Sequence, residues 1–322
     1  MTKFNIYTVA ALLPILSLIA NSSFAEVRFD LRFINGQKNE FNRNENEWMK
    51  KAVIEAATDL GRFIKQDAFV TIQVYSDPSC LYAEAQVRAV AVGSDRNRYT
   101  AKVMDRILNN QFIGIQVGIA RLWLRFLDLY TGELGDSPSW EGSIRFNTHQ
   151  FSDFKRLKQV AMHELTHKLG FISFTIRDSR FDETYSDYDR LIVDKDGNPL
   201  LISSNENGDL KANPRFNHRG EIFSCGENSK KRNNGNCVKL YNPPAYVPGG
   251  SVIHLDSGAY PKNIMTHNGG NYIAWNKYEI GILEDLGYEI DWTNYCKFIL
   301  NELPNNDFPQ ECFKRPPTQP EL

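Results

Sequence analysis

The sequence His-Glu-Leu-Thr-His at residues 163–167 constrains this chain more than any other feature. Two histidines four positions apart on a helix are rotated by roughly 40° from each other, so both imidazoles leave the same side and can hold one metal ion. Ser152 or Asp153 can cap the start of such a helix. An apolar stripe follows its other face: Phe154, Leu157, Ala161, Leu165 and Leu169. We therefore expect the stripe to seat the helix on the core while His163 and His167 face a cleft.

The residue types of this motif suit a catalytic zinc ion. Zn²⁺ binds neutral imidazole nitrogens, and catalytic zinc sites use three protein ligands and leave one position for water. The metal lowers the pKa of that water and polarises a substrate carbonyl. Glu164 can take a proton from the water and later deliver it to a leaving amine. We expect a Zn²⁺ cofactor with His163 and His167 as two ligands and a third ligand from elsewhere in the chain.

Two sequence patterns compete for the third ligand. Residues 182–187 are similar to the Glu-x-x-x-Asp pattern of the thermolysin-like gluzincins, in which Glu183 would be the ligand, but Glu183 follows His167 by only 16 positions. In the other pattern the helix ends at a glycine and a third histidine approaches from below. Gly170 fits this pattern, and residues 171–176 are rich in β-branched and aromatic side chains that disfavour a helix. The second pattern is therefore favoured.

Residues 163–171 resemble the metzincin metalloproteases. Compact members of that family have the third histidine three positions after the glycine, where this chain has Ser173. Leishmanolysin and its bacterial relatives insert a long segment there and place the histidine shortly before a methionine turn. Residues 251–266 follow that order. The resemblance thus implies His254 as the third zinc ligand and Met265 as the methionine that packs beneath the metal.

The resemblance also implies a function, that of a secreted zinc endopeptidase with Glu164 as general base and then acid. The strand expected at Gly142–Thr148, just before the active-site helix, would be the sheet edge along which an extended protein or peptide substrate pairs through main-chain hydrogen bonds. One alternative is a gluzincin-type peptidase that uses Glu183. Another is a secreted binding or adhesion module whose zinc is structural.

Three further histidines lie outside these motifs. His218 is in a polar loop and is interpreted as a surface residue, and His149 precedes the active-site helix and is interpreted as structural. His267 follows Met265 by two positions, which supports the hypothesis that it stabilises the oxyanion or acts as an extra metal ligand. The alternative is a simple turn residue. If His267 were a fourth protein ligand, it would close the site, as structural zinc sites are closed.

Hydrophobic periodicity predicts an α+β fold with a mixed sheet. Alternating apolar and polar residues predict strands at 27–33, 70–74, 84–92 and 142–148. Apolar stripes predict one helix at 44–65 and another at 275–286, the latter ending at Gly287. Residues 95–140 fit either helix or buried strand.

The N-terminus reads as an export signal cut after Ala25. Its apolar run, residues 10–20, is too short to span a bilayer, which takes roughly 20 residues. No later stretch is long and apolar enough to do so, so we expect a secreted or periplasmic protein. The mature chain is expected to comprise a catalytic subdomain at 26–170, a subdomain with the third ligand and the methionine turn at 171–295, and a tail at 296–322.

Charge and cysteine content limit the partners and the compartment. With 37 Lys+Arg against 39 Asp+Glu, the chain lacks the basic excess typical of proteins that bind nucleic acid, so we expect no nucleic-acid partner. We also expect a monomer. Export permits disulfides. Local pairing of Cys225 with Cys237 and of Cys296 with Cys312 is the simplest arrangement, with Cys80 left over, although any of the five could be the odd thiol.

Overall fold

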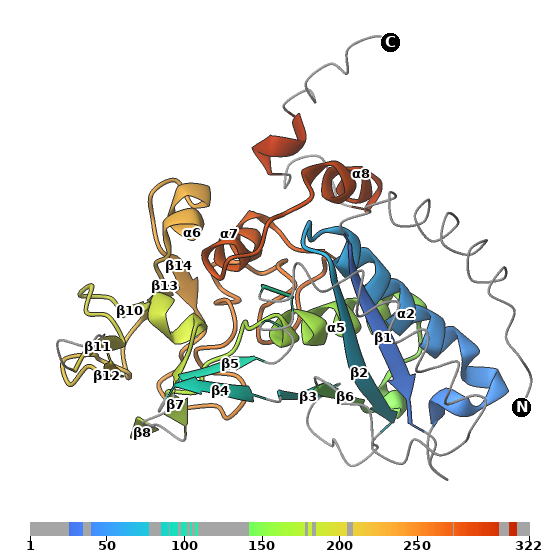
Figure 1. Cartoon of the computed structure of the whole chain (residues 1–322), viewed down its shortest axis with the longest axis horizontal. Helices are drawn as coiled ribbons and strands as arrows, with labels where there is room; N and C mark the ends of the chain where they lie inside the picture. The colour runs from blue at the N-terminus through green and yellow to red at the C-terminus, as the bar shows by residue number, and fades with distance from the viewer. Residues whose placement is uncertain are drawn as a thin grey trace, which may run out of the picture.

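The chain forms a mixed α+β structure, as predicted, and is known from a computed structural model (Figure 1). The described residues are 26–34, 40–76, 85–89, 91–95, 98–101, 104, 107–108, 142–177, 180–181, 185–204, 209–272, 274–302 and 309–313. The predicted export signal, Cys80, Glu183 and most of 95–140 lie outside them. Within the described ranges, no helix is long and apolar enough to cross a membrane.

The N-terminal part is built on a four-stranded sheet in the order β1-β2-β6-β3. Its strands are β1 (Val27–Phe33), β2 (Ala68–Ser76), β6 (Gly142–Phe146) and β3 (Ala85–Ala89). The first three run parallel, and β3 is antiparallel to β6. All four predicted strands are present, but the one expected at 84–92 is divided between β3 and β4 (Ala91–Asp95), which belongs to another sheet.

The prediction that residues 142–148 form the edge of the sheet is wrong. β6 pairs with β2 on one side and with β3 on the other, so its main-chain groups are already bonded. In the described part of the chain, β3 is the outer strand next to β6. The alternating pattern of β6 shows which of its faces is buried, but it carries no information about the strands on either side.

Two helices pack against each other and against this sheet (Figure 1). Helix α2 (Glu47–Arg62) follows the short 3-10 turns η1 (Glu40–Asn42) and η2 (Asn44–Asn46) and contacts β1. Helix α5 (Phe154–Lys168) follows η3 (Thr148–Gln150) and contacts β3. The predicted stripe of α2 is buried: Met49, Val53, Ala56 and Leu60, continued by Phe63 and Ile64.

Helix α5 begins and ends as its sequence predicts. The Asp153 carboxylate accepts a hydrogen bond of 2.8 Å from the backbone N–H of Arg156, and Gly170 leaves the helix with φ +99°, a conformation that favours glycine. Two residues of the C-terminal part hold the helix in place. Trp275 Nε1 donates to Thr166 Oγ1 at 2.8 Å, and the Tyr288 hydroxyl donates to the carbonyl of Leu169 at 2.8 Å.

Residues 176–240, together with strands β4 and β5 (Arg98–Ala101), form small sheets joined by loops. A three-stranded sheet contains β10 (Ile192–Asp194), β13 (Ile222–Ser224) and β14 (Val238–Leu240). Another contains β4, β5 and β9 (Tyr185–Ser186). Two-stranded pairs are β7 (Ile176–Arg177) with β8 (Arg180–Phe181), and β11 (Leu201–Ser203) with β12 (Leu210–Ala212). The 3-10 turn η4 (Tyr188–Leu191) lies between β9 and β10.

The C-terminal helices are α6 (Glu227–Arg232), α7 (Lys277–Asp285) and α8 (Trp292–Glu302), followed by the 3-10 turn η5 (Gln310–Phe313). The predicted end of α7 at Gly287 is confirmed, with φ +100°. Disulfides join Cys225 to Cys237 and Cys296 to Cys312, as predicted. The expected tail boundary at 296 falls inside α8, whose Tyr295 and Ile299 are fully buried.

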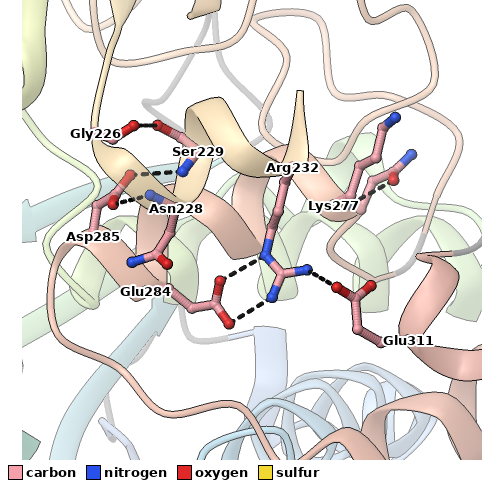
Figure 2. Close-up of polar contacts among 9 residues, drawn as sticks. Gly226, Asn228, Ser229, Arg232, Lys277, Glu284, Asp285 and Glu311 are labelled. Atoms are coloured by element: carbon pink, nitrogen blue, oxygen red, sulfur yellow. Dashed lines mark hydrogen bonds and ion pairs between the residues drawn. The ribbon is translucent and has the colours of Figure 1, made fainter. Parts of the chain in front are cut away.

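Arg232 joins these C-terminal elements in a cluster that we call the Arg232 clamp (Figure 2). Its guanidinium binds both carboxylate oxygens of Glu284 at 2.6 Å and one oxygen of Glu311 at 2.8 Å, and it lies 4.7 Å from the ring centroid of Trp292. Asp285 accepts hydrogen bonds from the backbone N–H groups of Asn228 and Ser229 at the start of α6. The clamp thus fastens α6, α7, α8 and η5 together.

Candidate metal centre

Three histidines from two distant segments meet at one point. The Nε2 atoms of His163 and His167 on α5 are 3.1 Å apart, and those atoms lie 3.1 and 3.2 Å from Nε2 of His254. Among the described residues, these three histidines form a group whose ligand atoms are close enough together to bind one metal ion. The structure thus brings together the three histidines that the sequence predicted as ligands.

Each of these imidazoles is oriented by a backbone carbonyl. The Nδ1 atoms of His163, His167 and His254 lie 2.7, 2.7 and 2.9 Å from the carbonyl oxygens of Ile264, Phe171 and Gly250, in that order. A carbonyl oxygen only accepts, so each Nδ1 must carry the proton. This assigns every ring the tautomer with a bare Nε2 lone pair.

The three rings are neutral near pH 7. Burial lowers the pKa of His163 to about 4 and that of His167 to about 3, and it lowers the pKa of His254 well below its usual value. His167 and His254 are each 5% exposed, whereas His163 is partly exposed. Three neutral rings whose lone pairs point at one another have no proton to share between them. Their 3.1–3.2 Å contacts are therefore not hydrogen bonds, and the arrangement suits a cation.

The spacing of these nitrogens fits a small metal ion. With metal–nitrogen distances of about 2.0–2.1 Å, tetrahedral geometry places two ligand nitrogens about 3.3–3.4 Å apart. The observed separations of 3.1–3.2 Å are close to this value. The donor set is entirely imidazole nitrogen, which suits zinc and its neighbours and does not suit calcium or magnesium. The three histidines can therefore hold a metal ion of the transition-metal type.

The segment that presents His254 is strained. Val252 has φ +75°, which is unfavourable for a β-branched residue. Its N–H donates to the carbonyl of Tyr241 at 2.7 Å, and its own carbonyl accepts from the Tyr188 hydroxyl at 3.2 Å. The backbone N–H of Tyr241 then bonds the carbonyl of His254 at 2.8 Å. Backbone bonds on both sides thus hold the strained residue and fix the third imidazole.

A buried carboxylate supports the turn that carries Met265. Glu279, fully buried on α7, accepts from Asn263 Nδ2 at 2.7 Å and from the backbone N–H of Met265 at 3.3 Å. These two residues flank Ile264, whose carbonyl orients His163. Burial raises the pKa of Glu279 to about 7. Met265 itself is fully buried, and its carbonyl accepts from the N–H of Leu255, next to His254.

Glu164, the predicted general base, is 7% exposed and directly follows His163 on α5. Lys168 lies one turn further along the helix and is 1% exposed. Burial lowers the pKa of Lys168 to about 7, and the charge of Glu164 opposes that shift. A Cβ atom on Gly142 would lie 2.6 Å from Lys168 Nζ, so the start of β6 is shaped around this ammonium group.

The other candidate residues considered in the sequence analysis do not belong to the group of three histidines in the described part of the chain. The His267 ring stacks on Tyr241, with centroids 4.4 Å apart, and its centroid is 5.5 Å from that of His254. It therefore lies beside the three histidines without belonging to their group. His149 is exposed rather than part of the core, and His218 is partly exposed. Glu183, the alternative ligand, lies outside the described residues.

Several supporting residues were not predicted from the sequence. Glu279 was detectable only as a helix-start signal, because Asn276 and Glu279 form a capping box at the start of α7. Asp189 is fully buried and accepts from Ser173 Oγ and from the backbone N–H of Phe174, so it fixes the chain just after α5. The three carbonyls that orient the imidazoles had no sequence signal, since every residue has a carbonyl group.

Comparisons with known proteins do not assign this chain to a family. No family model, curated protein or solved structure matches it. The geometry of the site therefore carries the functional argument.

Proposed function

We propose that this protein is an exported, zinc-dependent endopeptidase related to the metzincins. The observation that carries the proposal is the convergence of three neutral imidazole Nε2 atoms within 3.1–3.2 Å of one another, each held by a carbonyl at its Nδ1. The His-Glu-Leu-Thr-His sequence on α5 and the turn at Met265 support the resemblance. The two disulfides and the export signal expected at the N-terminus support a place outside the cytoplasm.

A catalytic site is supported over a structural one by the number of ligands. Structural zinc sites are usually closed by four protein ligands, whereas catalytic sites use three and keep one position for water or substrate. The group found in the described residues has three members, and His267 stacks on Tyr241 outside it. Of the three histidines, His163 is the one that is partly exposed.

The residues around the site supply the rest of the proposed reaction. A zinc ion held by His163, His167 and His254 would lower the pKa of water and polarise the substrate carbonyl. Glu164 would accept the proton of the attacking water and pass it to the amine that leaves. The carbonyls of Ile264, Phe171 and Gly250 keep the three imidazoles in the required tautomer. Peptide hydrolysis is the reaction that this combination supports best.

We further propose that an extended substrate pairs with β3 rather than with β6. Among the described strands β3 is the outer one, and it contacts α5, which carries His163 and His167. Main-chain pairing along such an edge tolerates many sequences. This replaces the predicted binding along residues 142–148.

The test is digestion of an unfolded protein by the purified, zinc-loaded chain. We expect cleavage at internal bonds, loss of cleavage with a chelator, and loss of cleavage in Glu164→Ala with zinc content unchanged. Bound zinc without any cleavage would instead favour the binding-module alternative. Zinc retained by His254→Ala and lost in Glu183→Gln would favour the gluzincin alternative.

A further inference from the structure

The face of α5 that carries the two histidines continues toward the start of the helix. At about 100° per residue, Arg156, Gln159, His163 and His167 all fall within about 80° of one another. Gln159 is one turn from His163, and Arg156 is two turns from it. The first half of this face therefore offers polar groups beside the proposed catalytic centre.

Two contacts locate the Arg156 guanidinium. Its Nη1 donates to Gln159 Oε1 at 2.9 Å. A Cβ atom on Gly269 would lie 3.2 Å from Nη1 and 3.3 Å from Nη2, so the guanidinium packs against Gly269. The N–H of Gly269 bonds the carbonyl of Thr266 at 2.9 Å, in the turn that includes His267. Arg156 therefore bridges α5 and the turn next to the metal centre.

Gln159 carries a buried donor that lacks an acceptor. The residue is 6% exposed, and in the described part of the chain its Nε2 has no hydrogen-bond partner. The bond from Arg156 to Oε1 fixes which end of the amide faces the guanidinium. A buried donor without a partner is destabilising, so such a group in a native protein calls for an explanation. A ligand that accepts hydrogen bonds would supply one.

The charge of this region selects the kind of ligand. The three imidazoles are neutral, so a bound dication and the Arg156 guanidinium together carry more positive charge than the neighbouring Glu164 carboxylate offsets. An arginine fork matches the two oxygens of a carboxylate, and hydrogen bonds to a charged group are the stronger ones. An anionic acceptor with two oxygens is therefore the best match to Arg156 and the Gln159 amide.

We propose that Arg156 and Gln159 form a carboxylate-binding subsite for the peptide substrate, an inference that rests on the proposed peptidase function. The carboxylate can belong to an Asp or Glu side chain or to the C-terminus of the peptide. Helix rise puts Gln159 about 6 Å and Arg156 about 10 Å from His163 along the axis. An extended peptide advances about 3.4 Å per residue, so the carboxylate lies about two or three residues from the scissile bond.

The test measures peptide binding independently of cleavage. Fluorescent peptides with a single Glu, placed two or three residues on either side of a central bond, are compared with matched Gln peptides on the zinc-loaded Glu164→Gln protein. A peptide without acidic side chains is tested with a free and with an amidated C-terminus. Tighter binding of the free form would identify the C-terminal carboxylate as the group that is bound. Cleavage of the same peptides by the unmodified protein is recorded separately.

We expect one of the carboxylate peptides to bind about tenfold more tightly than its neutral partner. In the same background, Arg156→Met should abolish this preference and Gln159→Glu should reduce it by adding a like charge. Lys155→Met is the matched control, because Lys155 is an exposed neighbour with the same charge and should leave the preference intact. Should Arg156→Met fail to fold, judged by its thermal midpoint, Arg156→Lys replaces it and should weaken the preference.

Equal binding of charged and neutral peptides, or a preference that survives the Arg156 replacement, would overturn the subsite. The outcome for the peptidase function is read separately. A carboxylate preference in binding without any cleavage would support the subsite and contradict the proposed reaction. Cleavage without a carboxylate preference would support the proposed reaction and contradict the subsite.

Discussion

The Arg232 clamp and the metal centre are both clusters of polar side chains gathered from distant parts of the chain, but they differ in charge. In the clamp, the Arg232 guanidinium binds the carboxylates of Glu284 and Glu311 (Figure 2). It also lies over the ring of Trp292. In the metal centre, three neutral imidazoles point their lone pairs at one another. The charged side chains of the clamp meet partners of opposite charge, whereas the lone pairs of the three imidazoles are suited to a cation.

This difference separates a cluster that stabilises the fold from one that we propose binds a metal ion. The clamp ties α6, α7, α8 and η5 together, and the two disulfides lie in the same region. The metal centre lies between α5 and the loops before α7. Backbone carbonyls of neighbouring residues fix the orientation of its three imidazoles. Changes to the clamp should therefore alter stability and spare metal binding, whereas changes near the metal centre should alter metal binding first.

The largest expected effect is on activity. Glu164→Gln keeps the size of the side chain but removes the proton acceptor, so kcat/KM for peptide hydrolysis should fall by roughly 10²–10⁴. Zinc content and thermal midpoint should stay close to those of the unmodified protein. The measurement is a peptide cleavage assay with metal analysis of the same sample. Cleavage at the original rate would assign the base to another residue.

The next effect tests the support beneath the metal centre. Glu279→Gln replaces one acceptor oxygen with a donor, so it disturbs the bonds to Asn263 or Met265 that flank the Ile264 carbonyl. Zinc affinity should weaken about 10–100-fold, as is typical when outer-shell partners are lost. Competition with a chromophoric chelator measures it. Glu284→Gln on the same helix is the control, since it alters the clamp and should leave zinc affinity unchanged.

Breaking the clamp should cost stability alone. Arg232→Met leaves Glu284 and Glu311 without their cation, and we expect a loss of about 2 kcal/mol in the free energy of unfolding, less than for a fully buried pair because Glu311 is partly exposed. Urea unfolding provides the value, and chelator competition should give unchanged zinc affinity. If zinc binding weakened in parallel with stability, the two clusters would not be independent.

The smallest effect concerns acid sensitivity without metal. Unfolded histidines protonate near pH 6.5, but burial keeps His163 and His167 neutral down to about pH 4 and 3. Between these values the unfolded state binds more protons, so stability is highest above pH 6.5 and falls as the pH drops. Each histidine contributes a slope of at most about 1.4 kcal/mol per pH unit. The raised pKa values of Glu279 and Asp189 act in the opposite sense.

The histidine contribution is isolated by a difference between two proteins. His167→Phe removes one buried imidazole, so in urea unfolding of the metal-free proteins its stability should depend less steeply on pH than that of the unmodified chain. His149→Gln, which changes an exposed histidine, should match the unmodified slope. Identical slopes for all three proteins would show that the imidazole is not held neutral.

Local sequence patterns predicted the part of the site that lies on one continuous segment, helix α5 with His163 and His167. The capping residue Asp153, the apolar stripe and Gly170 define α5, and the four-residue spacing puts His163 and His167 on one face of it. Spacing alone did not locate the third histidine, because nothing in a helical period points to a residue 87 positions away. The proposal of His254 came from a family resemblance, and the structure places it beside the pair.

The features that prediction missed depend on neighbours in space. The pattern of β6 gave its buried face, but its position inside the sheet depends on β3, which precedes it by a long segment. The tail expected at 296–322 begins inside helix α8, where Ile299 lies in the core. Glu279 could be recognised as a helix-capping residue, but its second role depends on the turn at Met265 folding against it.

The most direct test of the metal centre is the zinc content of the purified full chain, measured together with its thermal midpoint before and after chelation. The three-histidine site predicts one zinc ion per chain and a lower thermal midpoint without it, and His254→Ala should lose both the metal and the chelator response. If His254→Ala bound zinc as tightly as the unmodified protein, the three imidazoles would not form the metal site.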